Sequence, residues 1–123
     1  MAVPHHRTDL IEYAMIEQLL NVGKRGKGAL FKELLNLFQK NAPPSIAKIK
    51  SFLELRDGLS LSHEAHSLKG SSANLGAKHL AEICQTIEVL GKESRLQEAS
   101  EKISELDNVY LESLEELKKL IPV

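Results

Sequence analysis

Apolar residues recur at intervals of three and four positions along almost the whole chain of 123 residues. No stretch alternates convincingly with the period of two that a half-buried strand requires. The last such stretch, from Leu96 to Ile121, forms one nearly continuous stripe, which is typical of a long helix packed along a bundle. The turns between periodic segments are short, and short turns favour antiparallel neighbours. The pattern therefore predicts an all-α fold, an up-down helical bundle.

Glycine and proline residues divide this pattern into six expected helices. Because a proline lacks the backbone donor, Pro43 and Pro44 are expected to separate two helices. In chain order, the helices are expected to cover about residues 8–21, 30–42, 43–57, 59–75, 80–91 and 96–121. The first would turn Ile11, Met15 and Leu19 inward, and the last would be the longest. A flexible stretch of residues 1–7 would precede a single domain over residues 8–121.

Composition narrows the class of protein further. Apolar residues make up 42% and charged residues 27%, which suits one globular domain. The single cysteine, Cys84, cannot form an internal disulfide, so a cytoplasmic protein with a packed thiol is expected. No apolar run approaches the roughly 18 residues of a membrane span, so no insertion into a membrane is expected. Aromatic residues at 4% and a net charge of −1 argue against a nucleic-acid groove.

The predicted helix over residues 59–75 carries the most informative side chains. Its inward stripe is expected to consist of Leu61, Ala65, Leu68, Ser72 and Leu75. His66, Lys69 and Gly70 fall on a different face, where they would be exposed. A glycine inside a helix costs about 1 kcal/mol relative to alanine, and room beside an exposed imidazole would explain it. A neutral imidazole can act as a nucleophile, and Lys69 could partly neutralise a phosphoryl group on it.

The stretch from Ala65 to Ala77, A-H-S-L-K-G-S-S-A-N-L-G-A, resembles the signature of histidine-containing phosphotransfer (HPt) domains of multistep phosphorelays. The family pattern A-H-x-L-K-G-S-S-x-x-L-G-A is matched at every specified position, and the likeness covers roughly residues 8–120. The resemblance implies an antiparallel four-helix bundle with a short additional N-terminal helix. It also implies phosphorylation of His66, assistance from Lys69, and a small residue at Gly70 that keeps the site open.

The resemblance further implies a phosphoryl carrier rather than an enzyme. The chain has no G-x-x-x-x-G-K-[ST] loop and no evident metal cage, so it is not expected to make phosphohistidine unaided. It would take a phosphoryl group from the aspartate of one response-regulator receiver domain and pass it to another. A hybrid sensor histidine kinase would stand upstream, and Mg²⁺ would be supplied by the receiver. The carrier is expected to be a monomer with no cofactor of its own, and His63, Ser67 and Ala73 are expected to flank the docking surface.

Other interpretations remain open at this point. His63 and His66 could share a metal ion, but their spacing is not H-E-x-x-H and no third ligand is evident. His79 is expected to be an ordinary surface residue. The domain could instead resemble the phosphoacceptor module of a chemotaxis-type histidine kinase. It could also be a helical adaptor in which the histidine is incidental. Acid-labile phosphate on the protein would distinguish a phosphotransfer domain from such an adaptor.

Overall fold

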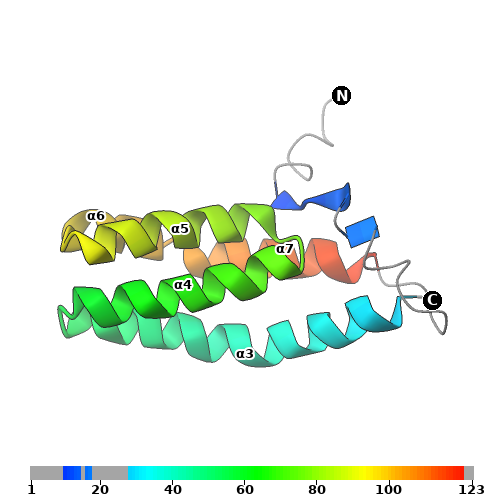
Figure 1. Cartoon of the computed structure of the whole chain (residues 1–123), viewed down its shortest axis with the longest axis horizontal. Helices are drawn as coiled ribbons and strands as arrows, with labels where there is room; N and C mark the ends of the chain where they lie inside the picture. Colours follow the sequence, from blue (N-terminus) through cyan, green and yellow to red (C-terminus); the bar gives the residue numbers. More distant parts are fainter. Residues whose placement is uncertain (1–9, 15, 18–27, 121–123) are drawn as a thin grey trace.

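The computed structural model describes residues 10–14, 16–17 and 28–120, and their regular structure is helical throughout (Figure 1). Five helices longer than one turn follow in chain order: α3 (Ala29–Glu54), α4 (Gly58–Asn74), α5 (Lys78–Lys92), α6 (Leu96–Ile103) and α7 (Leu106–Lys118). None of these helices is long and apolar enough to cross a bilayer. The predicted all-α class is confirmed.

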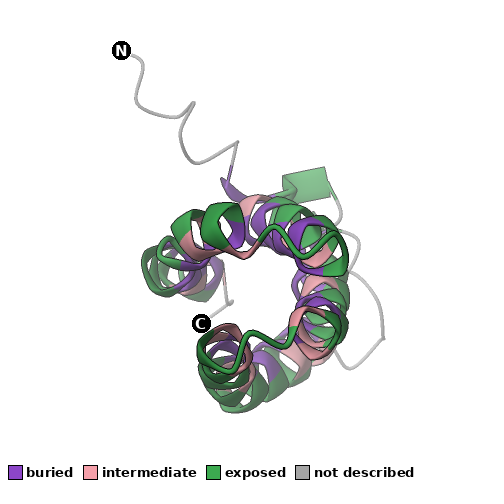
Figure 2. Ribbon diagram, turned by 90° about the vertical axis from the view of Figure 1, so that its left-hand side faces the viewer, coloured by how far each residue is buried: buried purple, intermediate pink, exposed green. Residues whose placement is uncertain are grey.

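The helices form an antiparallel four-helix bundle whose fourth arm is α6 followed by α7 (Figure 1). Each arm packs against the arms beside it, α3 against α4, α4 against α5, and α5 and α3 against the α6–α7 arm. Viewed end-on, the buried residues turn toward the centre of the bundle and the exposed residues turn outward (Figure 2). The predicted four-helix architecture is therefore confirmed.

The prediction that a helix ends before Pro43 is wrong. α3 runs through Pro43 and Pro44 without a break and, with 26 residues, is the longest helix among the described residues. Its buried residues continue at helical spacing on both sides of the prolines: Phe31, Leu35, Phe38, Ala42, Ile46 and Ile49. Both prolines are exposed, so the backbone bonds that they remove lie where water can replace them. Burial of each large apolar side chain contributes about 1.5–3 kcal/mol, which offsets the cost of the prolines.

The predicted long helix over residues 96–121 is interrupted at Ser104 and Glu105, and it is not the longest. The Ser104 hydroxyl donates to the Glu101 carbonyl oxygen at 2.6 Å, and the Glu105 amide donates to the Lys102 carbonyl oxygen at 3.0 Å. A serine that bonds the backbone of its own helix competes with regular helical bonding. Helix α7 continues in the direction of α6 after this tightened turn (Figure 1). Ile121, the last residue of the predicted stripe, lies outside the described residues.

Only part of the predicted N-terminal helix can be compared with the structure, because Met15 and Leu19 lie outside the described residues. Ile11 is buried as predicted, but the backbone at residues 11 and 12 is not helical. The Glu12 amide donates to the carbonyl oxygen of Gly76 at 2.8 Å, so this segment is attached to the turn between α4 and α5. Gly76 has a φ of 85°, which a residue with a side chain rarely adopts.

At the opposite end of the bundle, α4 and α5 approach each other closely through two glycines. A Cβ atom on Gly91 would lie 2.8 Å from Leu61 Cδ2 and 2.9 Å from the Gly58 carbonyl oxygen. A Cβ atom on Gly58 would lie 2.5 Å from the Gly91 carbonyl oxygen. Distances this short exclude a side chain at either position unless the two helices move apart. Next to this contact, the Ser62 hydroxyl donates to the carbonyl oxygen of Glu88 at 2.8 Å.

Candidate functional site

Helix α4 begins at a well-formed cap and turns one face to the core. The Asp57 carboxylate accepts from the Ser60 amide at 3.1 Å and from the Ser60 hydroxyl at 2.7 Å, and these bonds hold the pKa of Asp57 below its usual value. The predicted inward stripe of Leu61, Ala65, Leu68, Ser72 and Leu75 is buried throughout. The opposite face of α4 is an exposed ridge that consists of His63, His66, Ser67, Gly70 and Ala73.

His66 lies near the middle of this ridge with its side chain 66% exposed, as predicted. Its Nδ1 atom lies 3.1 Å from Oε2 of Glu88 on α5. An ionised carboxylate can only accept a hydrogen bond, so Nδ1 carries the proton and donates a hydrogen bond to Glu88. In the neutral ring the lone pair then resides on Nε2, the nitrogen that Glu88 does not contact. The arrangement selects one tautomer and leaves one nucleophilic nitrogen.

Lys69 holds the other side of the same carboxylate. Its Nζ atom lies 3.0 Å from Glu88 Oε1 and donates to Gln85 Oε1 at 2.7 Å. The Lys69 side chain is 27% exposed, so it is less exposed than predicted. Gln85 and Glu88 lie one turn apart on α5 and together draw the ammonium toward that helix. Lys69 is therefore positioned beside His66 through a shared partner.

The ionised form of Glu88 is favoured despite its partial burial. Its side chain is 15% exposed, and burial raises the pKa of the carboxyl group. The hydrogen bond and charge of Lys69, together with the contact from His66, outweigh that effect and hold the pKa below its usual value. Because Lys69 balances the carboxylate, the imidazole is oriented by Glu88 without facing an uncompensated negative charge.

Gly70 lies in open space, as the sequence predicts. No atom lies within 4 Å of the position that a Cβ atom would occupy, apart from the helix's own backbone and chain neighbours. Beside it, a hollow of about 540 Å³ lies between α4 and α5. Its lining includes Lys69, Gly70, Ala73, Ala81 and Gln85. The ridge and this hollow form one accessible surface next to the imidazole.

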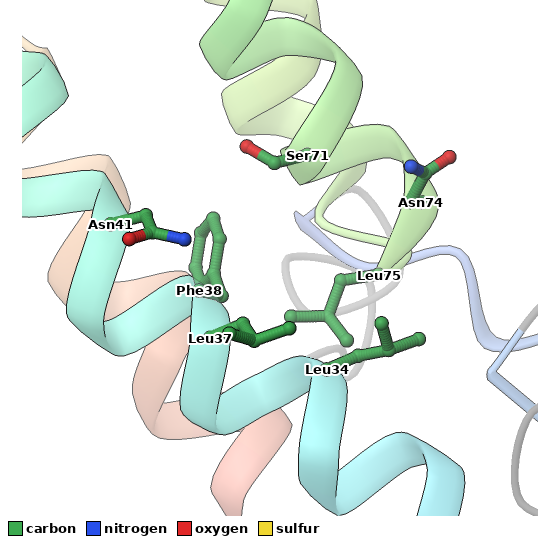
Figure 3. Close-up of a pocket in the computed structure, with 7 residues that line it drawn as sticks. All are labelled: Leu34, Leu37, Phe38, Asn41, Ser71, Asn74 and Leu75. Atoms are coloured by element: carbon green, nitrogen blue, oxygen red, sulfur yellow. The ribbon is translucent and has the colours of Figure 1, made fainter.

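The three residues expected to flank a docking surface are all exposed, but they do not share one hollow. Ala73 lines the hollow between α4 and α5, whereas Ser67 lines another, of about 350 Å³, between α3 and α4. His63 lies on the ridge one turn before His66. A smaller apolar hollow of about 170 Å³ also lies on the α3 side, where Phe38 and Leu75 face each other (Figure 3). The α4 ridge thus separates two flanks, and only the α5 flank contains Lys69.

The family model that describes the Hpt domain matches residues 33–120, which is most of the chain. The chain belongs to the Hpt domain family. This assignment agrees with the four-helix bundle and with the resemblance of residues 65–77 to the HPt signature.

Curated relatives of this Hpt chain include a phosphorelay regulator and a sensor protein. It is 32% identical over 82 residues to "Multistep phosphorelay regulator 1" of Schizosaccharomyces pombe, a match that covers 67% of this chain and 28% of that protein. It is 27% identical over 110 residues to the aerobic respiration control sensor protein ArcB of Escherichia coli, covering 89% of this chain and 14% of ArcB. The chain therefore spans less than a third of the length of either relative.

Solved structures share the fold of this Hpt domain. Histidine-containing phosphotransfer protein B from Pseudomonas aeruginosa PAO1 superposes with a TM-score of 0.80 at 24% identity, covering 89% of this chain and 92% of that one. Histidine-containing phosphotransfer protein MtHPt2 from Medicago truncatula superposes with a TM-score of 0.82 at 20% identity, covering 94% and 79%. At these identities the likeness to the solved structures establishes the four-helix fold and nothing further.

Two polar residues of the candidate site, Gln85 and Glu88, were not singled out as site residues from the sequence. Each lies one position after a buried residue of α5, Cys84 or Ile87, and so at the edge of the apolar stripe of that helix. Residues at the edge of a stripe face the neighbouring helix, which is the only sequence signal that indicates them. Cys84 is buried as predicted, and burial raises the pKa of its thiol to about 12.

Replacement of Gly70 by glutamine tests whether the open space serves access to the Hpt site. We expect Gly70→Gln to slow transfer from a phosphorylated receiver by roughly tenfold, because misplacement of a reacting group by about 1 Å costs up to 100-fold. The Gly70→Ala variant is the control. Its Cβ meets no neighbour, so it should transfer normally and gain up to about 1 kcal/mol of stability. Single-turnover transfer rates for Gly70→Gln equal to those of Gly70→Ala would contradict this role.

Proposed function

We propose that this chain carries a phosphoryl group on Nε2 of His66 and relays it between aspartates of receiver domains. The observation that supports this most directly is the contact from His66 Nδ1 to Glu88 at 3.1 Å, which directs the lone pair to Nε2 on an exposed ring. Membership of the Hpt family and the phosphorelay relative from S. pombe support the same reaction class.

In the proposed step, the Nε2 lone pair of His66 attacks the phosphorus of an aspartyl phosphate. A P–N bond forms, the P–O bond to the aspartate breaks, and the receiver's carboxylate leaves with the electron pair. The proton on Nδ1 stays in place, so the phosphorylated ring carries a positive charge next to the Glu88 carboxylate. That carboxylate stabilises the charged ring, and the reverse step returns the phosphoryl group to an aspartate.

The partners that we propose are response-regulator receiver domains, which would dock on the α4 ridge and on the hollow between α4 and α5. Those domains would supply the acidic pocket and the Mg²⁺ ion. A hybrid sensor histidine kinase would stand upstream, and this chain would act in the cytoplasm as a monomeric carrier without kinase activity of its own. The ArcB relative, a sensor protein, supports a place in such a relay.

A transfer assay with labelled receivers tests the proposed function. Phosphorylated receiver domains from the same cell should label the wild-type chain with phosphate that is stable in base and lost in acid. The label should then pass to a second, unphosphorylated receiver. A helical adaptor would take up no acid-labile phosphate from any receiver in the set. A chemotaxis-type phosphoacceptor module would be labelled by a kinase domain and ATP but by no receiver.

Glu88 gives a separate prediction within this function. The Glu88→Gln variant keeps the shape of the side chain but loses its charge, and charged hydrogen bonds are roughly twice as strong as neutral ones. We expect uptake of phosphate from phosphoramidate to slow by about fivefold, which corresponds to a loss of about 1 kcal/mol. The Glu93→Gln variant, at the end of the same helix, removes a charge paired with Arg95 and should leave the rate unchanged. Equal rates for both variants would remove Glu88 from the reaction.

A further inference from the structure

We propose that Ser62 is a positioning residue for the phosphoacceptor histidine, and that it acts through the backbone of Glu88. The inference rests on the proposed function but concerns how the site is held together. Ser62 is 1% exposed and lies one helical turn before His66 on α4. Among the hydrogen bonds of the described residues, it is bonded to neither the imidazole nor Lys69. Its hydroxyl donates to the carbonyl oxygen of Glu88 at 2.8 Å.

This bond joins α5 to α4 at the residue that orients the imidazole. Glu88 points its carboxylate at His66 and Lys69, while its backbone carbonyl accepts from Ser62 on the same helix as those two residues. The carboxylate therefore reaches α4 from a backbone that is itself fixed to α4. A shift of α5 along or away from α4 would break the Ser62 bond and move the Glu88 carboxylate relative to the imidazole.

The glycine contact beside Ser62 makes such a short bond between the helices possible. Gly91 lies three residues after Glu88, and Gly58 lies four residues before Ser62. A Cβ atom on Gly91 would lie 3.2 Å from the Ser62 amide nitrogen as well as against Gly58 and Leu61. The two helices are therefore in close contact next to the hydrogen bond, and the distance between them increases if Gly91 gains a side chain.

Ser72 provides a matched control on the same helix. Like Ser62 it is a buried serine, 0% exposed, and its hydroxyl donates to a backbone carbonyl, that of Leu68, at 2.7 Å. That carbonyl belongs to α4 itself, so the bond does not link two helices. The variants Ser62→Ala and Ser72→Ala thus each remove one serine hydroxyl at similar burial. They differ in whether the lost hydrogen bond joins α4 to α5.

The first readout is the tautomer of His66, which requires no phosphate. In the wild-type protein, the ¹⁵N chemical shifts of the His66 ring should show the proton on Nδ1. The Ser62→Ala variant should show a mixture of both tautomers, while Ser72→Ala should keep the wild-type shifts. The Gly91→Ala variant should show the same mixture of tautomers, because the added methyl group increases the distance between α4 and α5. Wild-type ring shifts in folded Ser62→Ala would overturn the proposal, as would an equal change in Ser72→Ala.

The second readout is single-turnover uptake of phosphate from phosphoramidate, with thermal denaturation of the same samples. We expect Ser62→Ala to react about fivefold more slowly than Ser72→Ala, the equivalent of one hydrogen bond of about 1 kcal/mol. If the two variants react equally and lose equal stability, Ser62 has only a structural role. If the wild-type chain takes up no phosphate at all, the proposed function fails, and the ring shifts still decide whether Ser62 positions Glu88.

Discussion

Replacement of His66 by glutamine should abolish phosphorylation of the chain while leaving its fold intact. The Nε2 nitrogen of His66 is the proposed nucleophile, and a glutamine amide has no lone pair of comparable reactivity. Because the side chain is 66% exposed, the free energy of unfolding should change by no more than about 0.5 kcal/mol. The measurement is uptake of acid-labile label from a phosphorylated receiver, together with thermal denaturation of the same sample.

Two other histidines serve as controls for this assignment. His63 lies on the same ridge one turn earlier, and His79 lies in the first turn of α5 beside Glu82. Neither lies within hydrogen-bond distance of Glu88 in the contacts of the described residues. His63→Gln and His79→Gln should both still accept phosphate. Labelling of His66→Gln, or loss of labelling in His63→Gln alone, would show that a different histidine is the acceptor.

Replacement of Lys69 by alanine should slow phosphorylation of His66 by about 10- to 100-fold, since a hydrogen bond to a charged group is worth about 1.5–3 kcal/mol. The structure gives two reasons for this loss. The variant removes a positive charge beside the incoming phosphoryl group, and it leaves the Glu88 carboxylate, 15% exposed, without its ammonium partner. An unbalanced carboxylate beside the imidazole repels the incoming phosphoryl group.

A double variant separates these two reasons. In Lys69→Ala/Glu88→Gln the stranded carboxylate is gone, so the rate should recover part of the way toward the wild-type value. The single variant should unfold more easily by about 1–2 kcal/mol, and the double variant should regain some of that stability. Lys69→Arg should restore only part of the rate, because a planar guanidinium does not replace a compact ammonium. Wild-type transfer by folded Lys69→Ala would remove lysine from the mechanism.

Much of this architecture follows from apolar spacing alone, and the exceptions have identifiable causes. The buried stripe of α4 and the exposure of His66 were both predictable, because helical period fixes which residues share a face. The break expected at Pro43 failed because local rules for proline do not count the apolar residues on either side. Ala42 and Ile46 are buried at uninterrupted helical spacing, and this continuity outweighed two missing backbone donors.

The site was harder to predict than the fold, because part of it comes from contacts between helices. His66, Lys69 and Gly70 lie within five consecutive residues of one helix, so their grouping is visible in the sequence. Glu88 lies 22 positions after His66, and its approach depends on how closely α4 and α5 pack. That closeness depends on Gly58 and Gly91, whose backbone contact no periodicity reveals. For the same reason, the sequence indicates the face on which Lys69 lies but not its pairing with Glu88.

The exposed ridge of α4 also affects the direction in which phosphate would flow. His66 projects from the outer side of a helix rather than from the floor of a cleft, so the part of the chain that the structure describes forms no wall around a group attached to its ring. Under the proposed function, the chain then offers the same nitrogen, at the same exposure, to an arriving and to a departing phosphoryl group. The net direction of phosphoryl transfer would follow the ratio of phosphorylated to unphosphorylated donor and acceptor partners. Reversing that ratio would reverse the direction of transfer through His66.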